Sequence, residues 1–245
     1  MAGEDVLGKA EDAARRGDLA GAERTLAAQW PDQAQMPGDG LHILAMVRFS
    51  QRRGQEALKL MQSAVAAEPD ALRHRIALGN ILADANDHSA AAAAFADALR
   101  IDMQWPGLMH AYGLACYRCG NYGEAEQAAR ALLKQGPNPQ AYDVLSCALR
   151  AQGKAQDALA AADEAIKLAP ENAAVQHSRG AALLKLGRAQ EALEVFDLLQ
   201  ARGVQAPAIW LNKGRALAGL KRQSDAIAAY TEGARRWPAD KELQK

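Results

Sequence analysis

The segment KLGRAQEALEVFD, residues Lys185–Asp197, nearly repeats the segment AQGKAQDALAAAD, residues Ala151–Asp163. The two segments lie 34 residues apart and share a glycine, an Ala-Gln pair, an acidic residue and an Ala-Leu pair in the same order. An offset of this size is typical of chains that use one small structural unit several times. The same period should therefore recur elsewhere in the sequence.

Small residues recur at this period along the whole chain. The first row contains Ala22, Ala57, Ala91, Ala125, Ala158, Ala192 and Ala226. The second row, twelve positions earlier, contains Ala10, Ala45, Gly79, Gly113, Ser146, Gly180 and Gly214. Small residues that face each other let two helices approach closely, so the two rows predict helical hairpins. No hairpin can bury its apolar face alone, and stacking of neighbouring hairpins would bury it.

Turn residues separate the two rows. Gly17, Gly120, Gly153 and Gly187 lie between them, with Asn86 in the same place in a third repeat. Glycine readily takes the left-handed conformation that ends a helix, and asparagine does so more often than other residues. These positions therefore predict the turn between the two helices of each hairpin.

The pattern of small residues, turn glycine, aromatic residue and closing proline resembles the tetratricopeptide repeat. Leu72–Trp105 and Pro207–Asp240 match it best, and Gly3–Pro37 matches it least. The resemblance implies an all-α fold, an α-solenoid of about seven antiparallel helix hairpins in a right-handed superhelix. It would form one domain over residues 1–245, with residues 241–245 starting a further helix or a cap. The expected repeats span residues 3–37, 38–71, 72–105, 106–138, 139–172, 173–206 and 207–240.

Some positions depart from this pattern. Arg48 stands where an aromatic residue is usual, and Arg179 and Lys213 each stand where a buried leucine is usual. Either the last two side chains pass the core and reach solvent, or the local helix is rotated. Trp30–Gly40 has the composition of a linker, and an ordinary loop with one extra residue is favoured there over a hinge.

The composition excludes several classes of protein. The 245 residues contain 29 Lys plus Arg and 29 Asp plus Glu, and this balance argues against nucleic-acid binding, which needs an uncompensated basic face. No segment approaches the ~20 apolar residues of a membrane span. Three cysteines and an acidic N-terminal segment argue against a secreted protein stapled by disulfides. We therefore expect a cytoplasmic protein that binds neither nucleic acid nor membranes.

No motif predicts catalysis or a metal site. Cys116 and Cys119 have the spacing of a metal-binding pair, but a structural zinc site needs four ligands and no second pair follows. Cys116 also occupies a core position of its repeat. His42, His110 and His177 fall at one repeat position, and alternate hairpins stand too far apart for one metal ion to bind all three. We expect no enzymatic activity, no cofactor and no metal.

The resemblance implies that the first helix of each hairpin lines a concave face. Positions two, five, nine and twelve of each repeat share that side of the helix. The candidate partner-binding residues are His42, Met46, Phe49, Arg73, Ile76, Asn80, His110, Leu114, Tyr117, Asp143, Arg150, His177 and Arg215. Apolar residues at such positions either anchor a ligand or pack against neighbouring hairpins. The leading hypothesis is a non-catalytic protein–protein interaction scaffold that binds a peptide or a partner protein in this groove.

Two other functions stay open at this point. The alternative is that the chain is the N-terminal repeat region of a larger bacterial enzyme, a sulfotransferase or a 2-oxoglutarate/iron oxygenase. It would also serve as a self-associating solenoid, a homo-oligomer formed through the C-terminal hairpin. That hairpin would leave Ile227, Tyr230 and Trp237 partly uncovered.

Overall fold

The computed structural model describes residues 2–105 and 107–243, and within these residues it contains α-helices, one short 3-10 helix and no strand. The chain divides into two compact units, Met1–Cys119 and Gly120–Lys245. In the N-terminal unit the helices are α1 (Ala2–Arg15), α2 (Leu19–Gln29), α3 (Gly38–Ser50), α4 (Gly54–Ala67), α5 (Leu72–Asp84), α6 (His88–Ile101) and α7 (Leu108–Arg118). In the C-terminal unit they are α8 (Tyr122–Gln135), α9 (Pro139–Ala151), α10 (Ala155–Leu168), α11 (Ala173–Lys185), α12 (Ala189–Ala201), α13 (Pro207–Gly219) and α14 (Gln223–Arg236).

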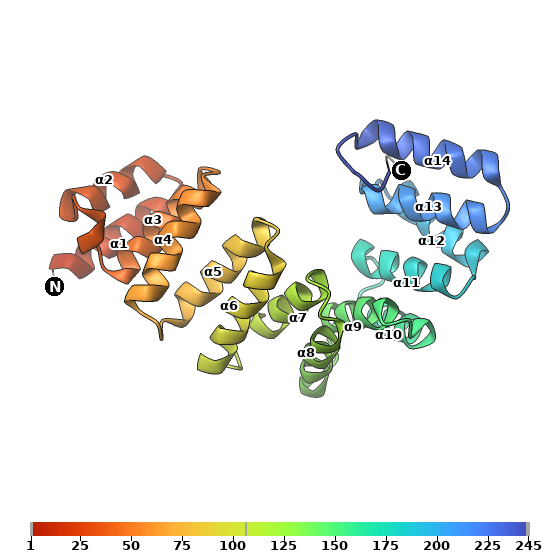
Figure 1. Ribbon diagram of the computed structural model, residues 1–245, viewed down its shortest axis with the longest axis horizontal. Coiled ribbons are helices and arrows are strands. Elements are labelled where there is room, and N and C mark those ends of the chain that lie inside the picture. Colours follow the sequence, from red (N-terminus) through yellow and green to blue (C-terminus); the bar gives the residue numbers. More distant parts are fainter. Residues whose placement is uncertain (1, 106, 244–245) are drawn as a thin grey trace. The chain divides into compact units, whose positions relative to one another are not determined.

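Within each unit, consecutive helices pack as hairpins, and the hairpins stack (Figure 1). In the N-terminal unit these are α1–α2, α3–α4 and α5–α6, followed by α7. In the C-terminal unit α8 is followed by α9–α10, α11–α12 and α13–α14. The odd-numbered helices, which we call the first helices, also contact one another, as α1 contacts α3 and α11 contacts both α9 and α13. The predicted all-α solenoid of helical hairpins is confirmed. Its right-handed superhelical path stays a prediction, and Pro106, which opens the expected fourth repeat, lies outside the described residues.

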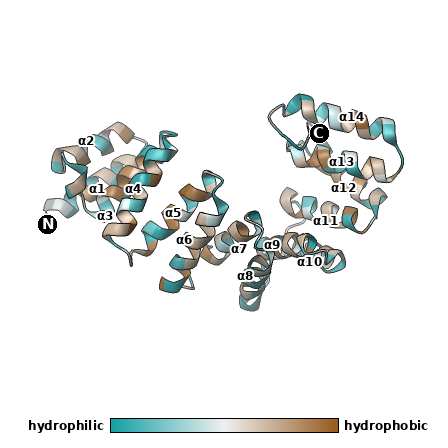
Figure 2. Ribbon diagram, viewed as in Figure 1, coloured by the Kyte–Doolittle hydropathy of each residue, from teal (hydrophilic) through white to brown (hydrophobic). Residues whose placement is uncertain are grey.

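The helices are amphipathic rather than apolar throughout. Figure 2 shows hydrophobic and hydrophilic residues alternating along the helices of both units. In the described part of the chain no helix has the length and apolar character needed to span a bilayer.

In three hairpins a glycine of the second row faces an aromatic ring on the second helix. A Cβ atom on Gly180 would lie 2.7 Å from the ring of Phe196, and one on Gly214 would lie 2.3 Å from the ring of Tyr230. Gly79 has the same relation to Phe95, at 2.4 Å. Each aromatic ring therefore occupies the space that a side chain on the facing helix would take, and the two helix axes approach closely.

The turn within each hairpin uses one left-handed residue. Gly17, Asn86, Gly120, Gly153 and Gly187 all have positive φ, as the sequence predicts for these positions. At the equivalent positions of two other hairpins, Arg52 has φ 63° and Lys221 has φ 60°. The hairpin therefore imposes this conformation even on residues with a Cβ atom, for which it is unfavourable.

The cationic residues that depart from the repeat pattern form ion pairs between hairpins. Arg179 Nε lies 2.8 Å from Asp163 Oδ1, and Lys213 Nζ lies 2.6 Å from Asp197 Oδ1. In both cases the cation is on a first helix and the carboxylate is on the second helix of the preceding hairpin. Both cationic side chains are partly buried, so their stems pass the core and their charged ends find a partner, as the snorkelling alternative predicts. Arg48 likewise pairs with Glu23 on α2, and the hydrogen bond from Arg48 is the main reason why the pKa of Glu23 is lowered.

The segment Trp30–Gly40 is a short ordered connection. It contains the 3-10 helix Gln33–Gln35, Met36 is buried, and α3 begins at Gly38. At the other end, Leu243 is buried and its methyl carbons lie 2.9 and 3.3 Å from the place of a Cβ atom on Gly233, so the segment after α14 folds back on this helix. Ile227 nevertheless remains 64% exposed. Gln244 and Lys245, the end of the expected cap, lie outside the described residues.

The Gly180–Phe196 contact gives a test of the hairpin core. We expect Gly180→Ala to lower the free energy of unfolding by about 1–3 kcal/mol, because the new methyl group overlaps the ring. Gly123→Ala is the matched control, since nothing lies within 4 Å of its would-be Cβ, and there the loss of glycine flexibility should stabilise the helix by about 0.5–1 kcal/mol. Urea unfolding monitored by circular dichroism measures both. Equal effects of the two substitutions would contradict the packing argument.

The left-handed lysine gives a second test. We expect Lys221→Gly to raise the free energy of unfolding by about 0.5–1 kcal/mol, because relief of a left-handed conformation that costs about 1–2 kcal/mol outweighs the entropy that glycine adds to the unfolded chain. Gly187→Ala, at the equivalent turn, should have the opposite sign. Thermal unfolding of both variants decides the matter, and a destabilised Lys221→Gly protein would show that the turn is not strained.

Candidate functional site

The predicted partner-binding residues all lie on first helices and all keep some solvent exposure. His42, Met46 and Phe49 lie on α3, and Arg73, Ile76 and Asn80 lie on α5. The other seven are His110, Leu114 and Tyr117 on α7, Asp143 and Arg150 on α9, His177 on α11 and Arg215 on α13. Met46 is 37% exposed. Exposure of a large apolar side chain at a predicted binding position favours a contact surface for a partner.

Six of these residues line one hollow in the N-terminal unit. The hollow has a volume of about 170 Å³, and its walls are His42, Met46, Phe49, Arg73, Ile76, Ala77, Asn80, Ile81 and Trp105. We call it the α3–α5 hollow. Its walls are mainly apolar, and Arg73 and Asn80 add polar groups. The hollow forms because positions five, nine and twelve share one helix face, and the stacking of the hairpins sets the faces of α3 and α5 side by side. His110, Leu114 and Tyr117 are not among its lining residues.

Ala77, Ile81 and Trp105 also line the hollow although the repeat positions did not select them, and of these three only Trp105 is exposed. It follows α6 in the connection to the next repeat and is 45% exposed. The repeat positions predict which face of a helix a residue lies on. They make no such prediction for a residue in a connecting segment. The sequence feature that could have indicated Trp105 is a tryptophan in a connecting segment, because tryptophan is enriched where proteins bind partners.

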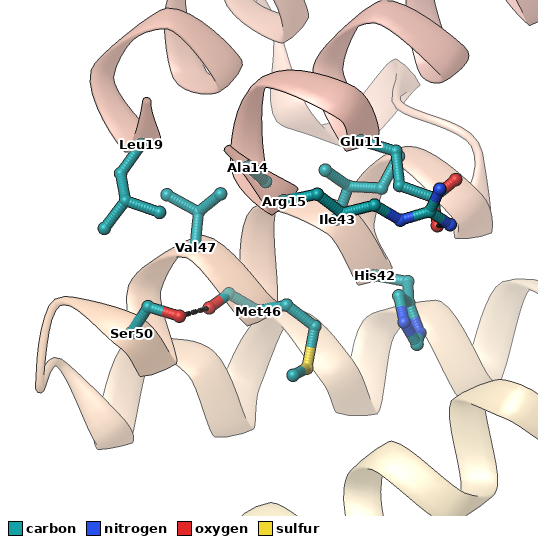
Figure 3. A pocket seen from close by; sticks show the side chains of 9 residues that line it. All are labelled: Glu11, Ala14, Arg15, Leu19, His42, Ile43, Met46, Val47 and Ser50. Atoms are coloured by element: carbon teal, nitrogen blue, oxygen red, sulfur yellow. Dashed lines mark hydrogen bonds and ion pairs between the residues drawn. The ribbon is translucent and has the colours of Figure 1, made fainter. Parts of the chain in front are cut away.

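A second hollow adjoins the first in the same unit. Its volume is about 240 Å³, and it lies between α3 and the α1–α2 hairpin, with Glu11, Ala14, Leu19 and Val47 among its walls. Figure 3 shows the Met46 side chain extending into this space from α3, with His42 on the same helix. His42 and Met46 line both hollows, so the first helices of this unit present two adjoining recesses.

A charged pair and two neighbouring histidine rings lie at the wall of the α3–α5 hollow. Arg73 forms an ion pair with Asp39, and His74 Nε2 lies 3.1 Å from the same carboxylate oxygen. The rings of His42 and His74 lie 5.1 Å apart. Burial is the main cause that lowers the pKa of His42 to about 4, and the nearby charges of His74 and Arg73 add to it. His42 is therefore neutral at pH 7, and it contributes an uncharged ring to both hollows.

In the C-terminal unit, polar side chains pair between neighbouring first helices, and two of them, Ser178 and Asn212, are buried. The Ser178 hydroxyl donates to Asp143 at 2.5 Å, and the Asn212 amide lies 3.0 Å from His177 Nε2. Arg215 donates to the Asn212 oxygen at 3.1 Å. Burial, and then the charge of Arg150, lowers the pKa of His177, which favours the neutral imidazole that accepts this hydrogen bond.

These polar contacts join residues that are 35 positions apart, one more than the repeat period. Asp39 with His74, Asp143 with Ser178 and His177 with Asn212 are each separated by 35 residues. Each pair joins the first helices of two successive hairpins. The repeat period is 34 residues. Each residue therefore contacts the neighbour of its equivalent residue in the next repeat, and not the equivalent residue itself.

The cysteines do not form a reactive centre in the described residues. Cys116 is fully buried in the core, as the sequence predicts, and the Cys119 thiol donates to the Cys116 carbonyl at 3.3 Å. Burial is the main cause that raises the pKa of the Cys147 thiol, so it stays protonated and weakly nucleophilic near neutral pH. The absence of enzymatic activity stays a prediction.

Comparison with known proteins gives matches of two kinds. The sequence model of the tetratricopeptide repeat matches residues 44–106, 144–207 and 198–241. No curated protein matches the sequence significantly. Many solved structures share the fold.

Three of these structures illustrate the range. A tetratricopeptide repeat protein from Parabacteroides merdae superposes with a TM-score of 0.81 at 16% identity and covers 98% of this chain and 95% of its own. A thermophilic repeat protein from Thermus thermophilus has a TM-score of 0.63 at 22% identity, covering 71% and 95%. YrrB, described as a repeat protein with an unusual peptide-binding site, has a TM-score of 0.50 at 19% identity, covering 75% and 95%. At these identities the likeness establishes the fold alone.

The neutral state of His42 gives a pH test. The folded protein binds this proton only near pH 4, whereas unfolded histidine binds it near the ordinary value of 6.5, so stability is fully present above pH 6.5 and is lost as the pH falls towards 4. We expect His42→Gln to reduce this loss by about 2 kcal/mol between pH 7 and pH 4, a figure that allows for the partial exposure of the ring. Urea unfolding of both proteins at the two pH values measures the difference. An identical pH dependence would show that His42 titrates normally.

Proposed function

The chain belongs to the tetratricopeptide repeat family, and from this premise we propose that it is a non-catalytic scaffold that binds a peptide or a partner protein along its first helices. The observation that carries the proposal is the α3–α5 hollow, where six residues selected by repeat position converge. A stacked array of hairpins presents such a surface preformed. Binding to a preformed surface therefore requires little ordering of the protein.

The chemistry of the hollow supports an extended ligand with an apolar anchor. Met46, Phe49, Ile76 and Trp105 supply apolar contact area, and an inserted side chain would bury it. Asn80 is exposed on the rim and offers both a donor and an acceptor to a ligand backbone. The solved structure of YrrB, which carries a peptide-binding site on the same fold, makes a peptide a reasonable first ligand.

The C-terminal unit would contribute directional contacts rather than anchors. Its polar first-helix residues are already oriented by hydrogen bonds, as in the His177–Asn212–Arg215 chain. Groups that are held in place by hydrogen bonds lose less freedom when a ligand binds. We therefore assign the apolar part of the recognition to the N-terminal unit and treat Asp143, His177 and Arg215 as polar contacts.

Peptide selection tests the proposal. A phage-displayed peptide library is selected on the immobilised full chain, and the affinity of the enriched peptides is measured by calorimetry. We expect Met46→Glu to weaken binding roughly tenfold or more, about 1.4 kcal/mol, because it places a charge in the apolar hollow. Leu198→Glu is the matched control, since Leu198 on α12 is 41% exposed and distant in sequence from the hollow.

The outcomes separate the possibilities. Unchanged circular dichroism spectra of both variants establish that folding is intact. Enriched peptides that bind Met46→Glu as tightly as the unsubstituted chain, or a selection that enriches no peptide, would rule out the α3–α5 hollow as the anchor site.

A further inference from the structure

Three potential metal ligands meet where α3, α4 and α5 come together in the N-terminal unit. Asp39 lies in the first turn of α3, Glu68 is the C-cap residue of α4, and His74 lies in the first turn of α5. One carboxylate oxygen of each acid and one imidazole nitrogen all lie within 4.8 Å of one another. The residues are 29 and 6 positions apart in the sequence and follow no metal-binding motif, which is why the sequence predicts no site here.

The imidazole is already held in a position suited to metal binding. His74 is 0% exposed, and its Nε2 lies 3.1 Å from Asp39 Oδ1. Two ligands of a tetrahedral zinc ion with bonds of about 2.0–2.1 Å are separated by about 3.3 Å. The His74–Asp39 distance therefore matches one edge of such a coordination shell. The second ring nitrogen of His74 is buried and has no hydrogen-bond partner in the described part of the chain, so nothing else there fixes the tautomer.

The Glu68 carboxylate is placed towards the same point and lacks a donor. A Cβ atom on Gly38 would lie 2.5 Å from Glu68 Oε1, so the missing side chain at position 38 makes room for this carboxylate. The Glu68 side chain is half-buried and has no hydrogen bond or ion pair within residues 2–105 and 107–243. A half-buried carboxylate without a partner, next to a second carboxylate, is unfavourable. A bound cation would give the Glu68 carboxylate a partner and would offset the repulsion between the two carboxylates.

We propose that Asp39, Glu68 and His74 bind one divalent transition-metal ion, with Zn²⁺ as the representative, through one oxygen of each carboxylate and Nε2 of His74. The imidazole selects a metal of this class, because Mg²⁺ and Ca²⁺ prefer ligand sets made only of oxygen. Three protein ligands leave the fourth tetrahedral position to water. Glu68 reaches the ion by a side-chain rotation, which its half-exposed position permits.

Arg73 competes with the metal for Asp39. Its guanidinium forms an ion pair with the same Asp39 oxygen that faces His74. The Arg73 side chain is about half exposed, so it can turn into solvent when an ion takes its place. This competition provides a signature that a metal bound elsewhere on the surface would not show.

Calorimetric titration of ZnCl2 into the full, metal-free chain tests the proposal. We expect one high-affinity site, a loss of affinity of roughly tenfold or more in Glu68→Gln and His74→Asn, and a gain in affinity in Arg73→Ala. Glu11→Gln, which removes an exposed carboxylate of α1, is the matched control and should bind as the unsubstituted chain does. If His74→Asn fails to fold by circular dichroism, Glu68→Gln and Arg73→Ala decide the question, because both residues are at least partly exposed.

The absorption spectrum of the Co²⁺-loaded protein distinguishes this site from the cysteines. We expect the weak d–d bands of nitrogen and oxygen ligands, without the intense charge-transfer band that thiolate ligands give. No binding by the unsubstituted chain, binding that is unchanged in Glu68→Gln and Arg73→Ala, or a thiolate band would each overturn the proposal.

Discussion

The packing of an aromatic ring against a helix position that has no side chain is the contact on which three of the hairpins depend. The rings of Phe95, Phe196 and Tyr230 fill the space beside Gly79, Gly180 and Gly214. This contact permits a close approach of the two helices, because the ring occupies the space that a side chain would take. In the α9–α10 hairpin a buried hydrogen bond from Ser146 to the Ala158 carbonyl, at 2.8 Å, occupies the same interface. We call the side of the first helices that carries the candidate partner-binding residues, all of which keep some solvent exposure, the available side.

The available side has different chemistry in the two units, although the backbone pattern is the same. On α3 and α5 it carries Met46, Phe49 and Ile76, and the result is an apolar hollow. On α9, α11 and α13 it carries residues that pair across neighbouring helices, such as Asp143 with Ser178. A repeat fold constrains the residues between its helices and leaves the first-helix stripe free to vary. The difference between the units is therefore where specificity for a ligand would reside.

Asp39 links the α3–α5 hollow to the interior of the N-terminal unit. The same carboxylate pairs with Arg73 at the wall of the hollow and with the buried ring of His74. Burial works to raise the pKa of Asp39, and the hydrogen bonds and charges of Arg73 and His74 outweigh it, so the pKa is lowered and the group stays ionised. One carboxylate thus links two first helices, α3 and α5.

The sequence by itself determined the features that depend on local geometry. The 34-residue period, the two rows of small residues and the left-handed turn positions specify helical hairpins, because helix formation and turn conformation are set by neighbouring residues. The shared face of positions five, nine and twelve placed His42, Met46 and Phe49 on one side of α3 for the same reason. Only the tertiary structure decided the contacts between hairpins, because these contacts depend on how one hairpin is rotated against the next. That rotation brings Trp105 from a connecting segment to the hollow and joins Asp39 to His74 one residue beyond the repeat period. The physical reason is that the volumes of side chains packed between hairpins set this rotation, and no single repeat contains both sides of that interface.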